Sequence, residues 1–376
     1  MTPDRSTLST ALSALASAVG ELPSAEATSA LVVVRAEDGD GQVRSAGSRV
    51  QTGSVDPGPA AERFRIGSIS RVFLAVVVLQ LAAEEQLDLN APARDLLPDL
   101  IPAAQADVSA RHLLNHTSGL ADDSDVRVND TAWFLQHRFE TFTAEQIVAL
   151  ALDQPLSFAP GTAQQATRVN YVLAGMLAER ATGLSHPDLI RQRVLDPLRL
   201  RATTLPGTDP TLPRPHRRGY ELVPDGVSER LLDVTEHNPS MYGAAGAMIS
   251  TPADLDRFLV ALFRGELLPP AQQEELFTVP DLPYQRGGRA FCSAGLESLP
   301  LGRGERGWGM PAVVHGCISG WGATRDLRRR LVYVVNPTHR GSTQLPPIVQ
   351  RIVGAAFGTD PGRYAGADPG VPETGV

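Results

Sequence analysis

Apolar residues near the start of the chain recur every three or four positions. Leu8, Leu12, Leu15 and Val19 would therefore share one side of a helix. Ser and Thr interrupt this apolar stretch and a single Arg precedes it, which argues against a signal peptide. We predict an amphipathic first helix.

A β-hairpin and a long helix are predicted next. The apolar run at 31–34 leads into Asp-Gly-Asp-Gly, a sequence typical of hairpin turns, and a second polar and apolar stretch ends near Gly47. A loop rich in Gly and Pro follows at 52–61. The apolar segment after it predicts a buried helix that starts near Ser68.

The middle of the chain has helical patterning and its end has strand patterning. We predict mostly helices over 76–285, with a Pro-rich interruption at 205–216. A closing helix is expected at 345–358, and the Pro- and Gly-rich tail at 359–376 is predicted to be disordered. Strand signals return near 290–300, 312–318 and 330–336.

Strands at both ends of the chain around a helical middle predict a discontinuous α+β fold. One lobe, formed by 1–75 and 286–358, would hold an antiparallel sheet flanked by terminal helices. The other lobe, 76–285, would be a mostly helical insertion. The cleft between two such lobes is the expected binding site.

Charge and composition narrow the possible partners. The 376 residues carry a net charge of −8, which does not favour a nucleic-acid surface, and no apolar run is long enough to span a membrane. The two cysteines, Cys292 and Cys317, do not suggest a disulfide framework. We therefore expect a cytoplasmic protein. The chain has no lysine, so all 34 basic residues are arginines and no lysine can act as a general base.

Six segments in a fixed order carry a family resemblance. Residues 64–73 read F-R-I-G-S-I-S-R-V-F, which is similar to the motif F-x-I-G-S-x-[TS]-K-x-F. The other five segments begin at His112, Pro160, Asp196, Ala245 and Val314. On these motifs the chain is identified as a divergent member of the superfamily of serine β-lactamases (class C), penicillin-binding proteins, DD-peptidases and serine esterases. The resemblance implies a β-lactamase/transpeptidase-like fold.

The departures from the family pattern fall on the residues that carry its chemistry. The resemblance implies that Ser68 would be the nucleophile and that a lysine three residues later would share its proton. Arg71 stands at that lysine position, and Ala166 and Arg168 stand where the family has tyrosine and asparagine. Arginine stays protonated in proteins, so Arg71 cannot serve as a general base. β-Lactamase and DD-peptidase activities are therefore not expected.

Four residues are predicted to form the altered catalytic site: Ser68, Arg71, Arg168 and His315. His315 replaces the middle residue of the family's K-T-G motif, where it could act as an acid or base or only fill the pocket. Arg71 and Arg168 would lie close together, which favours an anionic ligand between them, although a carboxylate of this chain would serve as well.

The predicted substrate-binding residues follow from their places in the motifs. Tyr242 and Trp321 stand where the family has cleft walls, and Cys317 follows Gly316, so its amide would be an oxyanion-hole donor. His112 and His116 have a spacing that suits a metal, but the resemblance places His116 in a turn. No metal and no cofactor are expected.

Three functions stay open on the sequence. The first is a repurposed enzyme of bacterial specialised metabolism, which would bind a small anionic substrate and use acid/base or electrostatic chemistry, as a lyase, cyclase or isomerase does. The second is a serine esterase or acyltransferase that uses Ser68 with His315. The third is a catalytically inactive protein that binds a ligand in the retained cleft.

Overall fold

The computed structural model describes residues 27–36, 41–47, 61–121, 130–226, 228–302, 304–337 and 346–358. The helix predicted within the first 20 residues and the tail predicted from 359 lie outside these ranges. No helix within the described ranges is both long and apolar enough to cross a membrane.

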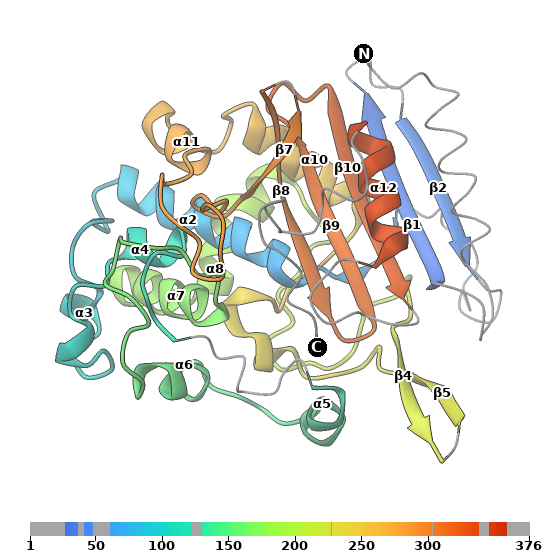
Figure 1. Cartoon of the computed structure of the whole chain (residues 1–376), viewed down its shortest axis with the longest axis horizontal. Helices are drawn as coiled ribbons and strands as arrows, with labels where there is room; N and C mark the ends of the chain where they lie inside the picture. The colour runs from blue at the N-terminus through green and yellow to red at the C-terminus, as the bar shows by residue number, and fades with distance from the viewer. Residues whose placement is uncertain are drawn as a thin grey trace.

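A six-stranded antiparallel sheet forms one side of the molecule, with the order β2-β1-β10-β9-β8-β7 (Figure 1). The strands from the two ends of the chain therefore pair in one sheet, as predicted. Its strands are β1 (Ala27–Ala36), β2 (Gly41–Gly47), β7 (Glu297–Gly302), β8 (Glu305–Val314), β9 (Cys317–Thr324) and β10 (Arg329–Pro337).

Helices cover both faces of this sheet. Alternate side chains of a strand point to opposite faces, so Leu31 and Val33 of β1 join the main core whereas Val32 and Val34 join a second core beneath α12 (Pro347–Phe357). The main core lies under α2 (Ser70–Ala83), α7 (Arg168–Thr182) and α10 (Pro252–Phe263). This α+β layout is the predicted fold class, and α12 is the predicted closing helix.

Shorter helices complete the part of the chain between the sheet strands. They are α3 (Ala93–Leu96), α4 (Ala110–Leu114), α5 (Thr131–His137), α6 (Ala144–Leu152), α8 (His186–Ile190), α9 (Asp196–Leu198) and α11 (Pro270–Leu276). Short 3₁₀ segments are η2 (Gly67–Ile69), η3 (Ala103–Gln105) and η6 (Pro239–Ala245), and η5 (Arg191–Leu195) is a short π-helical segment. The division of the chain into two lobes stays a prediction. α10, inside the predicted helical lobe, contacts β9 and β10 of the sheet.

Two features correct the predicted elements. The region predicted to be mostly helical also holds the hairpin of β4 (Tyr220–Asp225) and β5 (Ser228–Asp233), as well as the short pair of β3 (Phe64–Arg65) and β6 (Ile249–Ser250). The hairpin turns at Gly226, whose φ of 66° favours glycine. The strand predicted at 312–318 is the end of β8, a two-residue turn and the start of β9.

Candidate active site

Ser68 lies in η2, the turn that joins β3 to α2. The amide of Ser70 donates to the carbonyl oxygens of Gly67 and Ser68 and closes this turn. Gly67 has a φ of 49°, and a Cβ there would lie 3.0 Å from Val314 Cγ1 on β8. The turn is therefore pressed against the end of β8. Ser68 is half-buried, and no other residue of the described ranges makes a hydrogen bond with its hydroxyl.

Arg71 lies on the first turn of α2, among buried polar groups. Its guanidinium carbon is 5.6 Å from the centre of the Tyr171 ring. Burial raises the pKa of the Glu297 carboxyl, at the start of β7, to about 7, and the charge of Arg71 opposes that rise. Burial and Glu297 together raise the pKa of the Cys292 thiol. A carboxylate of this chain therefore lies within the electrostatic reach of Arg71.

Arg168 is the first residue of α7, and Thr167 caps that helix by accepting a hydrogen bond from the Val169 amide. The guanidinium of Arg168 reaches η6 and donates to the Met241 carbonyl oxygen. Ala166, two residues earlier, has no group that could carry a proton. The positions that hold tyrosine and asparagine in the family thus hold a methyl group and a cation that donates to the backbone.

His315 lies in the turn between β8 and β9 and is buried, with 1% of its side chain exposed. Its ring stacks on Phe134 of α5 at 3.6 Å between centres. Its Nδ1 is 3.1 Å from Oε1 of Glu221 on β4, and the same oxygen accepts from the Gly316 amide at 2.7 Å. The predicted acid or base is therefore enclosed by the chain, which favours the reading that it fills space.

An aromatic cluster surrounds this turn; we use the name for Phe134, His237, Tyr242 and His315. Phe134 is fully buried and meets His237 edge-on at 5.3 Å, and His237 meets Tyr242 at 5.7 Å. Val314, where the family has histidine or lysine, packs with Phe134 and Tyr242. Tyr242, predicted to line the cleft, thus contributes to a packed group of rings.

The other predicted binding residues have separate surroundings. Trp321 lies in the main core, stacks on Phe258 at 5.7 Å and donates from Nε1 to the Leu255 carbonyl at 2.8 Å. Cys317 begins β9 opposite Val314, and burial raises the pKa of its thiol to about 12. Cys292 and Cys317 are both free thiols.

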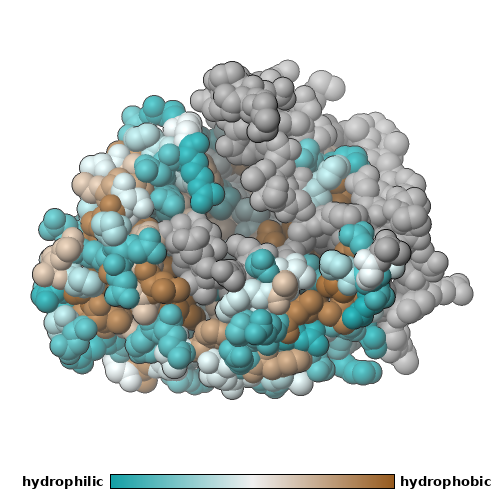
Figure 2. Space-filling view, turned by 60° about the horizontal axis from the view of Figure 1, so that its bottom comes forward, coloured by the Kyte–Doolittle hydropathy of each residue, from teal (hydrophilic) through white to brown (hydrophobic). Residues whose placement is uncertain are grey.

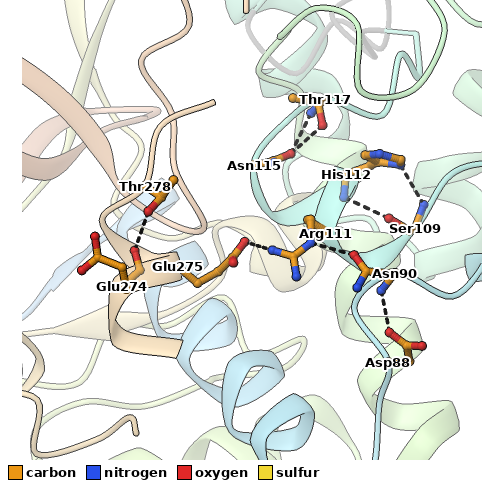
Figure 3. A network of polar contacts seen from close by, with 10 residues as sticks. All are labelled: Asp88, Asn90, Ser109, Arg111, His112, Asn115, Thr117, Glu274, Glu275 and Thr278. Atoms are coloured by element: carbon orange, nitrogen blue, oxygen red, sulfur yellow. Dashed lines mark hydrogen bonds and ion pairs between the residues drawn. The ribbon is translucent and has the colours of Figure 1, made fainter. Parts of the chain in front are cut away.

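The two histidines with metal-like spacing have structural contacts instead. His116 is buried with a φ of 61°, and its Nδ1 accepts from Asn170 Nδ2 at 2.9 Å. His112 accepts from the Ser109 amide and caps α4, within the network of Figure 3 that also joins Arg111 to Glu275. Among the described residues no group of three or more potential ligands could hold a metal.

Sequence reasoning missed two acidic residues of the site, Glu221 and Glu297. Glu221 belongs to the unpredicted β4–β5 hairpin, and its side chain is buried because alternate residues of β4 point inward. Glu297 lies within the strand predicted near 290–300 and begins β7, but its proximity to Arg71 depends on how that strand meets α2. The period-two pattern of β4 was the one available signal.

Comparison with known proteins assigns the fold. The chain is similar to the D-stereospecific amidohydrolase from Streptomyces sp., at 32% identity over 95% of this chain and 100% of that chain, with a TM-score of 0.79. It also resembles the D-amino acid amidase of Ochrobactrum anthropi SV3 in complex with D-phenylalanine, at 24% identity over 93% of this chain and 98% of that chain, with a TM-score of 0.74. The second likeness shows the fold alone.

Relatives known by sequence agree with this assignment. Esterase EstB of Burkholderia gladioli is 28% identical, over 53% of this chain and 56% of the esterase. Penicillin-binding protein 4* of Bacillus subtilis is 26% identical, over 57% of this chain and 48% of that protein, so the matches span about half of each relative. The protein has the fold of the serine hydrolase superfamily. The family model described as Beta-lactamase matches residues 15–353, and the chain belongs to this family.

Proposed function

We propose that this protein binds a small molecule in the family's site without hydrolysing it. The observation that carries the proposal is the half-buried Ser68 hydroxyl, which no other described residue engages in a hydrogen bond. Serine attacks an acyl carbon efficiently only when a nearby base accepts its proton. Arg71, Ala166 and Val314 occupy the three positions where the family has proton-handling residues.

The packing around His315, in the segment that corresponds to the family's K-T-G motif, supports the same function. A base at His315 would need a free ring nitrogen facing Ser68 or the substrate. Instead the ring is stacked on Phe134, and only 1% of the His315 side chain is exposed. We infer that the protein keeps the fold for recognition. The likeness to the D-stereospecific amidohydrolase suggests D-configured amides as the first ligands to test.

The experiment compares wild type with Ser68→Ala and with a variant in which the motif is restored, Arg71→Lys/Ala166→Tyr/Arg168→Asn. Each is incubated with a fluorophosphonate and weighed intact, and each is assayed with D-phenylalanine amide and p-nitrophenyl acetate. We expect neither an adduct nor turnover above Ser68→Ala in the wild type, and a new adduct in the restored variant. A Ser68-dependent adduct or product in the wild type would support the esterase or acyltransferase instead.

A second candidate is the repurposed enzyme with acid/base chemistry. It is favoured by Glu297, because a carboxyl group with a pKa of about 7 can both give and take a proton near neutral pH. This candidate predicts turnover of a small substrate that persists in Ser68→Ala and is lost in Glu297→Gln. An anionic substrate would have to compete with Glu297 for Arg71.

A further inference from the structure

A pocket lies beside the turn formed by His315 and Gly316, and both residues line it. Neither Ser68 nor Arg71 lines it. Its wall includes the segment that leads into β4, which reaches the turn closely: a Cβ on Gly316 would lie 2.7 Å from Gly219 Cα. Two glycines face each other there, and this close backbone contact closes one side of the pocket.

The lining of this pocket is cationic on one side. Three of the lining residues are arginines, Arg65, Arg217 and Arg218, and the described lining includes no aspartate or glutamate. Two of the three form ion pairs, and the third, Arg65, is under the electrostatic influence of Asp209 and Glu236. Arg217 Nε lies 2.9 Å from a Glu62 carboxylate oxygen, and Arg218 Nη1 lies 3.4 Å from an Asp233 carboxylate oxygen.

Arg65 is the buried charge of the pocket, with 6% exposed. Its Nη2 donates to the carbonyl oxygens of Pro210 at 2.6 Å and His237 at 3.0 Å. Its Nε and Nη1 make no hydrogen bond to any described residue. Burial lowers the pKa of Arg65 to about 10. A buried guanidinium with open N–H groups is unfavourable unless an acceptor satisfies it.

Apolar side chains line another part of the pocket, together with the polar residues Ser29, Thr235, His237 and Asn336. Phe64, Leu212, Val234 and Val334 contribute hydrocarbon surface beside Arg65. We propose that this pocket binds a short aliphatic carboxylate, whose oxygens accept hydrogen bonds from Arg65 and whose hydrocarbon part packs on these side chains. Hydrogen bonds between ionised partners are stronger than neutral ones, so the charge of the ligand decides its binding. This site is separate from Ser68 and does not depend on the proposed function.

The test titrates the full-length protein with sodium isobutyrate and with isobutyramide, its neutral isostere, at an ionic strength held constant with NaCl. Calorimetry should show one saturable site for isobutyrate, and the unfolding midpoint should rise with the logarithm of its concentration. Isobutyramide should do neither. Equal stabilisation by the two compounds, or no saturable binding of isobutyrate, would overturn the proposal.

Variants then locate the site. Arg65→Met should abolish isobutyrate binding while its circular dichroism remains that of the wild type. If that variant does not fold, Arg218→Gln at the pocket is compared with Arg230→Gln on β5, since the two side chains have similar exposure, 45% and 54%. We expect about two- to fivefold weaker binding for Arg218→Gln and no change for Arg230→Gln. If Arg218→Gln and Arg230→Gln weakened isobutyrate binding equally, the ligand would bind elsewhere. Ser68→Ala should bind isobutyrate like the wild type.

Discussion

Two regions of the molecule differ in their polar groups. One is the turn that holds His116, and the other is the surroundings of Ser68. In the turn, Asn170 joins His116 to Ser118, and the Tyr171 hydroxyl donates to the Leu114 carbonyl at 2.8 Å. Around Ser68, the polar positions of the family are replaced by Ala166 and Val314, or by arginines that this chain's own groups contact. The scaffold of the family is retained and its proton-transfer groups are lost.

This difference shows that the fold itself requires some positions, such as Gly119, and leaves others free to change. Gly119 has a φ of 74°, and a Cβ there would lie 2.0 Å from the Phe158 carbonyl oxygen, so a larger residue cannot fit without displacing backbone. No comparable restriction keeps lysine at position 71, since arginine fits there. Figure 2 shows the face at the bottom of Figure 1, where hydrophobic and hydrophilic residues are mixed. The overall shape can thus be kept while the chemistry changes.

The largest effect is expected from Gly119→Ala. Steric overlap with the Phe158 carbonyl and the left-handed backbone should together lower the free energy of unfolding by about 4 kcal/mol. Gly183→Ala is the matched control, because Gly183 has a φ of 73° and nothing within 4 Å of a Cβ, so about 1 kcal/mol is expected. Urea unfolding measures both. Equal losses would mean that the close contact does not restrict the turn.

Phe134→Ala tests whether the altered site is a packed core. Removing this fully buried ring from His315 should lower the free energy of unfolding by about 3 kcal/mol. Phe139→Ala, at a ring that is 55% exposed just after the same helix, should change it by about 0.5 kcal/mol or less. If Phe134→Ala were as mild as its control, the cluster would be loosely packed and His315 accessible.

Glu297→Gln tests how the buried carboxyl group makes the stability of the protein depend on pH. The pKa of Glu297 rises from 4.5 in the unfolded chain to about 7 in the folded protein, so the folded state binds more protons between these values. The stability gained from the protonated carboxyl is complete below pH 4.5 and is lost as the pH rises to about 7. Between pH 5 and pH 8, the free energy of unfolding of the wild type should fall by about 2 kcal/mol relative to that of Glu297→Gln.

Urea unfolding of both proteins at several pH values measures this difference. Glu305→Gln, at an exposed position of the neighbouring strand β8, is the control. The free energy of unfolding of Glu305→Gln should differ from that of the wild type by the same amount at every pH in this range. A constant difference for Glu297→Gln as well would show that Arg71 keeps the carboxyl ionised throughout.

The sequence predicted the elements whose apolar positions repeat regularly. α2, α12 and the paired terminal strands follow such patterns, and the helix predicted to start near Ser68 is α2, which begins at Ser70. The sequence did not predict β4 and β5, because β5 has no buried residue and β4 alternates over only four residues. Side-chain environments were also missed. The contacts of His315 with Phe134 and Glu221 join three segments far apart in the chain, and local patterns do not report such contacts.

Ser68→Ala should have the smallest effect on stability. The Ser68 hydroxyl is half-buried and makes no hydrogen bond within the described part of the chain, so its loss should change the free energy of unfolding by about 0.5 kcal/mol or less. Ser70→Ala is the matched control two residues later. Its buried hydroxyl accepts from the Met248 amide at 3.2 Å, and leaving that amide unpaired should lower the free energy of unfolding by about 1–2 kcal/mol. Urea unfolding compares the two variants. A loss at Ser68 as large as that at Ser70 would mean that the retained serine holds the turn, which would explain its presence without any role in binding or catalysis.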